Sequence, residues 1–444
     1  MAKLLLRLLH RAGFGAVEQV MRHRSFRIYL FGHIPNVVGI WVVRVAIGWL
    51  AWQLTGSALW LGAIAAADSL PVLVLGPFGG ALADRLDRRK ISVATQTVLA
   101  VIAVFLTVLT VSDLMTIWIL FSLALARGIT FAFWQPVRLA LMPNLVPREE
   151  IPTAIALNSS TFNTAQFIGP AVAAGLLKLG GPSLAFAFNV FAAGMMVWTL
   201  LAIDVPLSAR ARHERGSVYA EMVAGFRYAL THAGIGPMLF LLLILGIAIR
   251  PLTELMPGFA DVVFGLDVGG YSMMVSSVGI GAMCGAIWML RQGNRGRITA
   301  IALRAGVVGG AAVLLFALTS WLPLALVCLA VVGFSMTSGG IATQQLVQLS
   351  VPDEMRGRVL SLFGMIFRGG PAAGALIMGW IADTTGLSWP VGIGAALGLV
   401  AFIIANGHRN RLQAVFETAD GASENPTRTG DTADRAVGKR RMEQ

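Results

Sequence analysis

Long apolar segments recur along almost the whole sequence, and they limit what the chain can fold into more than any other feature. The 444 residues are 56% hydrophobic and only 13% charged, and the mean hydropathy is +0.75. A helix that rises about 1.5 Å per residue can cross the roughly 30 Å hydrocarbon core of a membrane within each of these segments. Soluble proteins of this length do not have this composition. We therefore predict an all-α membrane protein.

The apolar segments are separated by connections of different length. The connections on one surface are short, and the longest connection on the other surface covers residues 204–234. We expect twelve transmembrane helices, which lie near residues 27–54, 58–80, 91–112, 115–137, 152–178, 183–203, 235–261, 269–290, 298–318, 322–346, 356–380 and 388–407.

Basic residues gather on one of the two surfaces. The chain carries 34 Lys and Arg against 22 Asp and Glu, a formal charge of +12 that could indicate a nucleic-acid partner. Most of these residues, however, fall in the tails, in alternate connections or at adjacent helix ends, and Lys178 alone falls at the opposite surface. This positive-inside pattern excludes nucleic acid as the explanation and places both termini in the cytoplasm. Acidic lipid headgroups account for the remaining basicity.

The segments outside the spans differ in composition. Residues 1–25 form a short apolar run that Arg7 and Arg11 interrupt, which favours a cytoplasmic amphipathic helix over a cleaved signal peptide. The cytoplasmic linker is 205–234, and the polar cytoplasmic tail at 409–444 is expected to be disordered. The spans then divide into an N-terminal half, 26–204, and a C-terminal half, 235–408.

A stretch of small and basic residues joins the second and third spans. From Gly79 to Lys90 it reads GGALADRLDRRK, and its charges place it at the membrane surface, where small residues allow close helix packing. It resembles the signature between the second and third helices of the major facilitator superfamily, although Asp87 stands where that family usually has glycine. The resemblance implies that conformational gating involves Gly80, Asp84, Arg85 and Arg88.

The two sets of six spans also resemble each other. VPREE precedes the fifth span and VPDEMR precedes the eleventh, and each of these spans then reaches a cluster of small residues around a proline. The offset of about 200 residues is roughly half of the membrane domain, as an internal repeat requires. The major facilitator superfamily has this architecture, so the resemblance implies two pseudo-symmetric six-helix halves.

Within that superfamily the chain looks most like bacterial exporters of drugs and siderophores. Its fifth span contains Ala165-x-x-x-Gly169-Pro170-x-x-Ala173-Ala174, which resembles the antiporter signature G-x-x-x-G-P-x-x-G-G with three glycines replaced by alanine. The resemblance implies a drug:proton antiporter of the bacterial cytoplasmic (inner) membrane, in which Gly169 and Pro170 contribute to gating. A helix whose small residues only pack closely is the alternative interpretation.

Two pairs of charged residues lie inside the expected spans, where an unpaired charge costs on the order of several kcal/mol. Arg44 and Asp68 are each twelve residues from the turn at Gly56, so they lie at similar depth. Arg250 and Glu254 are one helical turn apart in the seventh span. We take Asp68 and Glu254 as candidate proton-coupling carboxylates, with Arg44 and Arg250 as their partners. Permanent structural ion pairs are the alternative.

Other polar residues within the spans are candidates for the lining of a substrate cavity. Basic residues outnumber acidic ones at mid-membrane, and this favours an anionic or zwitterionic small molecule. Adhesion between helices is the alternative role for the neutral members. The candidates are His33, Asn36, Arg127, Gln135, Asn158, Asn163, Gln166 and Arg368.

No pattern typical of an enzyme or a cofactor site is found in the sequence. It contains no G-x-x-x-x-G-K-[ST] loop, no H-E-x-x-H and no Cys/His ligand set, and Cys284 and Cys328 fall inside apolar segments. We therefore expect no enzyme activity, no cofactor, no metal and no nucleic-acid partner.

The sequence as a whole predicts a monomeric, proton-coupled secondary transporter that exports a small organic molecule, drug-like or siderophore-like, by alternating access. Its partners would be the substrate, protons and membrane lipids. Proton-coupled or facilitated uptake of a small metabolite is the alternative, because sequence does not reveal the direction of transport. A non-transporting membrane receptor or scaffold on the same fold is the alternative of a different class.

Overall fold

The computed structural model describes residues 15–85, 87–203, 226–228, 231–232, 234–292, 298–411 and 413. Over these residues the chain is helical almost throughout and contains no strand. Long helices satisfy their own backbone hydrogen bonds, as a hydrocarbon environment requires. Part of the predicted N-terminal amphipathic segment forms α2 (Gly15–Arg22). Residues 1–14, most of the linker and the tail from 414 lie outside the described part of the chain.

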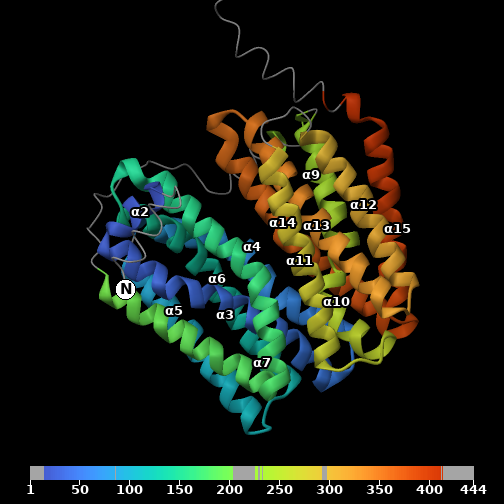
Figure 1. Ribbon diagram of the computed structural model, residues 1–444, viewed down its shortest axis with the longest axis horizontal. Coiled ribbons are helices and arrows are strands. Elements are labelled where there is room, and N and C mark those ends of the chain that lie inside the picture. Colours follow the sequence, from blue (N-terminus) through green and yellow to red (C-terminus); the bar gives the residue numbers. More distant parts are fainter. Residues whose placement is uncertain are drawn as a thin grey trace, which may run out of the picture.

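The helices form two groups in space, which correspond to the two halves of the sequence. Figure 1 shows the blue-to-green helices of the N-terminal half beside the yellow-to-red helices of the C-terminal half. The N-terminal half contains α3 (Arg24–Thr55), α4 (Ala58–Arg85), α5 (Arg88–Val111), α6 (Ile117–Leu141), the short η1 (Met142–Leu145) and η2 (Arg148–Glu150), and α7 (Ile151–Ala202). The C-terminal half contains α9 (Ile235–Ile244), η3 (Leu245–Ile249), α10 (Leu252–Gly258), η4 (Phe259–Val263), α11 (Val268–Gln292), α12 (Ile298–Leu318), α13 (Leu322–Ser350), α14 (Asp353–Thr385) and α15 (Ser388–Gly407).

The number of spans agrees with the prediction once α7 is inspected. Eleven helical segments of the described chain are long and apolar enough to cross a membrane. One of them contains α7, which bends where Gly180 and Gly181 leave helical geometry. Gly181 has a φ of 66°, a conformation that glycine adopts without steric cost. Counting α7 as two spans gives twelve, which confirms the predicted fold of two six-helix halves.

Local caps explain where two neighbouring helices end and begin. Gly56 follows α3 with a φ of 59°, and its N–H donates to the carbonyl of Trp52, as in a glycine C-cap. Asp87 precedes α5, and its side chain accepts from the backbone N–H groups of Arg89 and Lys90. The residue that departs from the superfamily signature therefore serves as the N-cap of α5.

The seventh span is built from four short elements, of which two are π-helical. The π-helical turns η3 and η4 alternate with α9 and α10. Pro251 precedes α10 and Pro257 lies inside it, and a proline cannot donate to the regular i to i−4 pattern. The prediction that proline interrupts this helix is confirmed at Pro251, whereas Pro257 stays within α10. Turns of this kind often occur at functional sites.

The halves meet at the end of the bundle that holds the Gly56 turn, which we name the Gly56 end. The opposite end, where Arg24 begins α3, is the Arg24 end. At the Gly56 end Asp383, near the end of α14, accepts from Ser57 Oγ and from the backbone N–H of Ala58, each at 2.7 Å. A carboxylate of one half thus caps the first turn of α4 in the other half.

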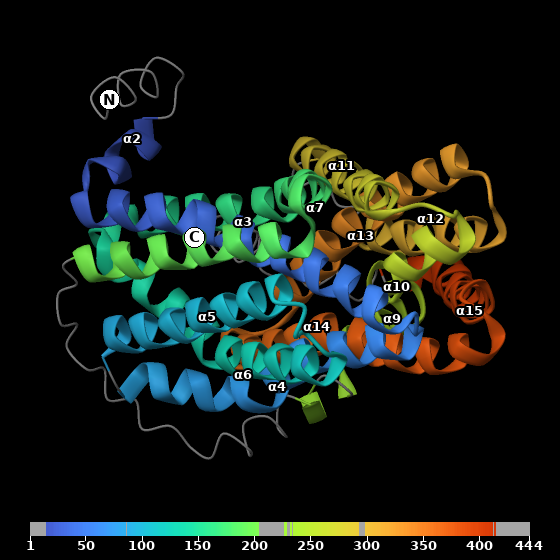
Figure 2. The same ribbon diagram turned by 90° about the horizontal axis from the view of Figure 1, so that it is seen from below.

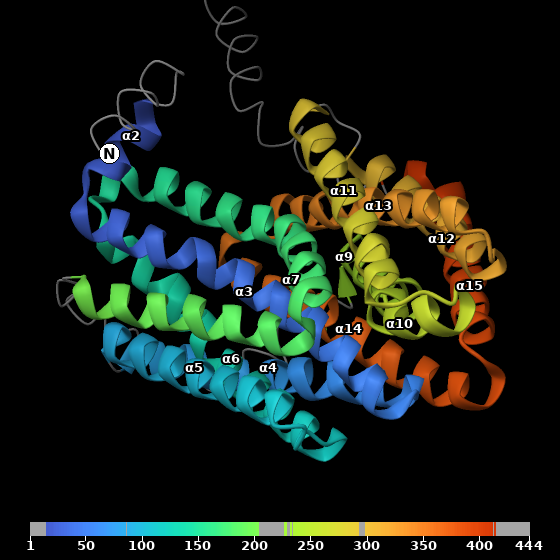
Figure 3. The same cartoon turned by 60° about the horizontal axis from the view of Figure 1, so that its bottom comes forward.

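Aromatic side chains extend this seam toward the middle of the membrane. Trp52 Nε1 donates to Asp261 Oδ2 at 2.8 Å, and Trp49 stacks on Tyr271 with ring centroids 5.6 Å apart. Figures 2 and 3 show the end of α3 and the beginning of α4 reaching across to α10 and α14. The hydrogen bonds described between the halves therefore concentrate from mid-span to the Gly56 end.

Candidate functional site

A layer of charged side chains lies near the middle of the spans. Asp68 is ten residues into α4 and Arg127 ten residues into α6, which corresponds to about 15 Å of helix at about 1.5 Å per residue. Arg44 lies eleven residues before the end of α3, and Glu254 lies nine residues before the end of η4. All four are therefore near the midplane of a hydrocarbon core of about 30 Å. Charges at this depth are costly and are functional candidates for that reason.

Asp68 and Arg127 form a bidentate ion pair inside the N-terminal half. Arg127 Nε lies 2.8 Å from Asp68 Oδ1, and Nη2 lies 2.9 Å from Oδ2. The side chain of Arg127 is 7% exposed and that of Asp68 is 20% exposed. The next residue on α6, Gly128, allows this approach, since an added methyl group would lie 2.7 Å from the carbonyl oxygen of Asp68. The pair is thus fixed by a close crossing of α4 and α6.

Arg44 and Glu254 form a second ion pair, and this pair joins the two halves. Arg44 on α3 donates through Nη2 to Glu254 Oε1 on α10. The Glu254 side chain is 14% exposed and the Arg44 side chain is 42% exposed. The predicted pairing of Arg44 with Asp68 is therefore wrong, because equal depth does not fix the direction in which each helix presents its side chain.

Arg250 does not partner Glu254, contrary to the prediction. Its Nη1 donates to the carbonyl of Phe367 at 2.7 Å, and its guanidinium carbon lies 4.0 Å from the centre of the Phe367 ring. The predicted i, i+4 pair assumed a regular helix, whereas η3 ends and Pro251 follows at this point. Arg250 thus links the seventh span to α14 within the C-terminal half.

Arg368 is exposed beside this contact and has no ion pair or side-chain hydrogen bond within the described residues. Arg44 and Arg138 both act on it electrostatically, as does Asp68. Arginines of both halves therefore converge near the central layer, and positive charge exceeds negative charge there.

Arg138 was not predicted from the sequence, because it lies in the last turn of α6, where a basic residue usually faces water. In the structure it is buried, and Nη1 lies 3.4 Å from His33 Nε2. Its guanidinium carbon lies 4.9 Å from the Trp134 ring centre and 5.2 Å from the Phe162 ring centre. The spacing of eleven residues from Arg127, about three helical turns, is the signal that could have identified it.

This cluster contains a buried cation with unused hydrogen-bonding capacity. Arg138 Nε and His33 Nδ1 have no partner among the described residues. His33 also stacks on Tyr29, with ring centroids 5.1 Å apart. Two aromatic rings thus lie beside the Arg138 guanidinium, and its Nε donor stays unsatisfied among the described residues.

Of the neutral candidates for the cavity lining, two form hydrogen bonds between helices and two have no side-chain hydrogen bond among the described residues. Asn36 accepts from Gln96 at 2.7 Å and joins α3 to α5, and Asn158 accepts from Tyr29 at 3.4 Å and joins α3 to α7. These contacts account for both residues as adhesion between helices. Gln135 is half-buried and Gln166 is exposed, without side-chain hydrogen bonds among the described residues, and the Asn163 side chain lies outside the description.

The predicted gating residues are only partly described. Gly80, Asp84 and Arg85 fall on the last turns of α4, whose side chains lie outside the described part, so their role stays a prediction. Arg88 Nη1 donates to the carbonyl of Ala140 at 3.1 Å and links α5 to α6.

The small residues of the fifth span pack closely, as both interpretations of that motif require. Pro170 is buried, and a methyl group added to Gly169 would collide with Cβ of Trp41.

Within the described residues, no group of three or more His, Cys, Asp or Glu could hold a metal ion.

Comparisons with known proteins agree with this architecture. The macrolide efflux protein A of Streptococcus pyogenes is 25% identical over 364 residues, which cover 80% of this chain and 89% of that protein. The enterobactin exporter EntS of Escherichia coli strain E24377A is 24% identical over 384 residues, covering 86% of this chain and 90% of that protein.

Solved structures show the same fold at low sequence identity. A bacterial homologue of the human lysosomal transporter Spinster is 13% identical and has a TM-score of 0.65, covering 89% of this chain and 97% of that one. The human organic anion transporter MFSD10 is 16% identical, with a TM-score of 0.62 and coverage of 86% and 98%.

The family model described as transmembrane secretion effector matches residues 19–441, nearly the whole chain. The match includes both six-helix halves and the connection between them. Twelve spans, two pseudo-symmetric halves and a central charged layer are the features expected of such a transporter. The chain belongs to the transmembrane secretion effector family of the major facilitator superfamily.

Proposed function

We propose that the protein is a proton-coupled exporter of a small anionic or zwitterionic organic molecule. In this proposal the two halves rock against each other, so that the central charged layer faces one side of the membrane and then the other. The family description and the two exporters among the relatives support the direction of transport.

The observation that carries the proposal is the ion pair between Arg44 and Glu254. Because the partners belong to different halves, the pair forms only while the halves are together at this level. A proton on Glu254 removes its charge and leaves Arg44 without its counterion, which weakens the seam toward the Gly56 end. Protonation thereby shifts the equilibrium between the two conformations, in which the central charged layer faces one side of the membrane or the other.

Asp68 is the other candidate for the proton-coupling carboxylate, but its contacts favour a structural role. Both of its oxygens are used by Arg127 of the same half. This contact does not have to break when the halves separate. We propose that Glu254 is the proton-coupling carboxylate and that the Asp68–Arg127 pair fixes α4 against α6.

The excess of positive charge supports the proposed substrate class. Arg44 and Arg138 act electrostatically on Arg368, and a bound anion would relieve this repulsion. The half-buried ring of Phe162 beside Arg138 would provide apolar surface for a drug-like or siderophore-like body.

The proposed placement follows the distribution of basic residues. The Arg24 end would face the cytoplasm of a bacterial cell, with both termini on that side and the Gly56 end outside. The unit would be a monomer in the cytoplasmic membrane, with halves at 26–204 and 235–408 and the linker at 205–234 between them.

A proteoliposome assay with a pH-sensitive dye tests the proposal. Wild-type protein, Glu254→Gln and Asp68→Asn are given a pH gradient and then an anionic catecholate, a neutral macrolide or a cationic dye. We expect proton flux that depends on the anionic compound, is lost in Glu254→Gln and persists in Asp68→Asn. Binding of the catecholate, measured by thermal shift, shows that an inactive variant is folded.

Several outcomes would contradict parts of the proposal. Proton and compound moving in the same direction would replace export with uptake. Binding without any flux would indicate a receptor or scaffold, and a preference for the cationic dye would overturn the substrate class. Flux that survives in Glu254→Gln but is lost in an Asp68→Asn protein that still binds the catecholate would transfer the coupling role to Asp68.

A further inference from the structure

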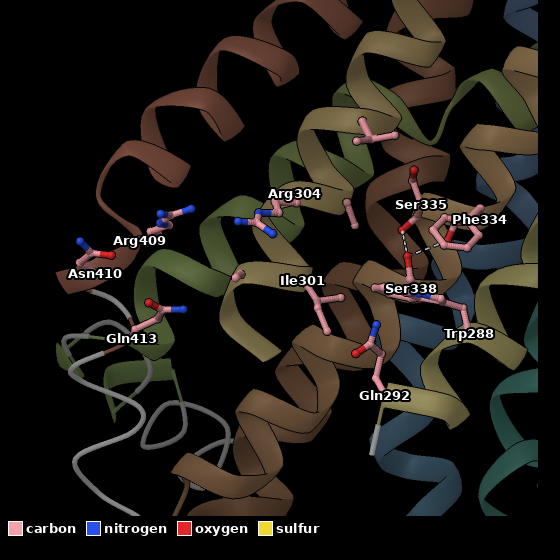
Figure 4. A pocket seen from close by; sticks show the side chains of 13 residues that line it. Trp288, Gln292, Ile301, Arg304, Phe334, Ser335, Ser338, Arg409, Asn410 and Gln413 are labelled. Atoms are coloured by element: carbon pink, nitrogen blue, oxygen red, sulfur yellow. Dashed lines mark hydrogen bonds between the residues drawn. The ribbon is translucent and has the colours of Figure 1, made fainter. Parts of the chain in front are cut away.

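A cavity of about 570 Å³ lies in the C-terminal half, apart from the central layer. Its walls come from α11, α12, α13 and the residues that follow α15. α12 packs mainly against α13, α15 and η3, which belong to its own half. The lining residues of α11 and α12 lie toward the Arg24 end of these helices, and those of α13 lie near its middle. Figure 4 shows the cavity from close by.

The cavity is lined by two arginines and by no acidic residue of the described chain. Figure 4 shows Arg304, from α12, and Arg409, after α15, extending toward one another. Neither has an ion pair or a side-chain hydrogen bond among the described residues. Two unneutralised guanidinium groups at one cavity attract an anion.

A buried hydroxyl group on the wall independently points to a ligand. Ser335 is 4% exposed, and its Oγ has no hydrogen-bond partner in the described structure. Ser338, one turn further along α13, donates to the carbonyl of Phe334 at 2.7 Å and is satisfied. A buried polar group without a partner is costly, and a ligand oxygen in the cavity would satisfy it.

The depth of Arg304 and the face of α12 beyond it indicate the kind of anion. Arg304 lies six residues after the start of α12, about 9 Å along the helix axis, which is on the Arg24 side of the midplane. From this depth a long arginine side chain can extend to the polar boundary of a bilayer. On the same face Val308, Leu315 and Leu318 are exposed and apolar. Trp288 of α11 lines the cavity as well, and tryptophan is common at this boundary. A polar site therefore continues into an apolar stripe.

We propose that this cavity binds the phosphodiester headgroup of an anionic phospholipid. The guanidinium groups of Arg304 and Arg409 hold the phosphate oxygens, and Ser335 donates a hydrogen bond to one of them. The acyl chains lie along the part of this stripe that runs from Val308 toward Leu315. Anionic lipids are abundant in the leaflet that faces basic connections, and they bind basic pockets between helices.

Lipid titration into nanodiscs tests this site without reference to transport. The full-length protein is placed in neutral phosphatidylcholine, and phosphatidylglycerol is added while bound lipid is counted by native mass spectrometry. Arg304→Gln and Arg409→Gln are compared with Arg411→Gln, which removes the same charge two residues later but does not line the cavity. We expect the two cavity variants to bind phosphatidylglycerol about tenfold more weakly and Arg411→Gln to match the wild type.

Competition with inorganic phosphate and glycerol phosphate separates the possible sources of the phosphate group. Weak competition by both, at millimolar concentration or not at all, supports a lipid site, because the apolar stripe contributes to binding. Binding of inorganic phosphate as tight as that of the lipid would overturn the lipid assignment. An equal loss in Arg411→Gln, or unchanged binding in Arg304→Gln and Arg409→Gln, would show only general surface charge and would overturn the site. Arg304→Lys, which keeps the charge, is the control for a folding defect as the cause of weaker lipid binding in Arg304→Gln.

Discussion

Asp68 and Arg127 depend on each other, because each lies at mid-membrane depth and neutralises the other. Removing one partner of such a pair leaves an unpaired charge and costs about 3–5 kcal/mol, whereas replacing both can be nearly neutral. We expect Arg127→Gln to lower the thermal unfolding temperature markedly and the double variant Asp68→Asn/Arg127→Gln to recover most of the loss.

Unfolding of the purified protein in detergent, followed by tryptophan fluorescence, measures both variants under the same conditions. The coupling energy from the complete double-mutant cycle isolates the contribution of the pair. A double variant as unstable as Arg127→Gln alone would mean that the residues act separately, despite the two contacts at 2.8 and 2.9 Å.

Single residues also show what can and what cannot be predicted from the sequence. The sequence identifies Arg44, Asp68 and Glu254 as charges inside the membrane, because charge in an apolar segment is conspicuous. It does not identify their partners, because pairing depends on helix rotation and on which half each helix faces. Arg138 was missed since its burial comes from Trp134 and Phe162, and helix-end position alone suggested an exposed residue.

At the scale of elements, the N-cap of α5 gives the altered signature loop a measurable role. Asp87 accepts from backbone N–H groups of the first turn, and replacing such a residue by alanine costs about 1 kcal/mol. We expect Asp87→Ala to speed amide exchange in the first turn of α5, and Asp87→Asn to preserve protection. Asp87→Gly, which restores the usual residue of the superfamily, should cost only a few tenths of a kcal/mol, so equal exchange in the alanine and glycine variants would argue against capping.

The start of α9 has a cap that depends on pH. His232 Nδ1 accepts from the backbone N–H groups of Gly234 at 3.2 Å and Ile235 at 3.3 Å, which requires a neutral ring. Partial burial lowers the pKa of His232 below its ordinary value of 6.5. The stabilisation is therefore complete above that value and is lost as the pH falls through the lower pKa of the folded protein.

Amide exchange at Gly234 and Ile235, corrected for the intrinsic effect of pH, checks this prediction. Protection should fall as the pH is lowered below about 6.5. His232→Asn keeps an acceptor but does not titrate, so its corrected protection should be flat across the same range. A pH dependence that persists in His232→Asn would assign the effect to another group.

The positions of the elements follow closely from the sequence, because crossing a membrane sets both their length and their composition. α12 at Ile298–Leu318 has the predicted limits. The seventh span shows the limit of this reasoning, since Pro251 and Pro257 indicate an interruption but not its π-helical form. That form depends on packing against other helices.

At the scale of the whole molecule, the sequence predicts two similar halves but not the end at which they meet. Hydropathy and repeats are the same in every state of such a transporter, whereas the seam depends on a few polar contacts of low total energy. Asp383 with Ser57, Trp52 with Asp261 and Arg44 with Glu254 join the halves here. These contacts determine the balance between states.

Asp383 offers the clearest test of that balance, because it caps α4 from the other half. A hydrogen bond to a charged group contributes about 1.5–3 kcal/mol, so Asp383→Ala should shift the balance toward opening at the Gly56 end by about tenfold or more. Asp267→Ala is the matched control, since Asp267 accepts from Gly269 and Gly270 of α11 within its own half.

Spin labels on cysteines introduced at Leu114 and Leu318, which are exposed in opposite halves at the Gly56 end, report the separation. Asp383→Ala should add a population at longer distance, and Asp267→Ala should leave the distance distribution unchanged. An equal shift in both variants would mean that losing any helix N-cap changes the distance, whether or not the cap joins the two halves. No shift in Asp383→Ala would mean that the two remaining contacts, Trp52 with Asp261 and Arg44 with Glu254, are enough to hold the halves together.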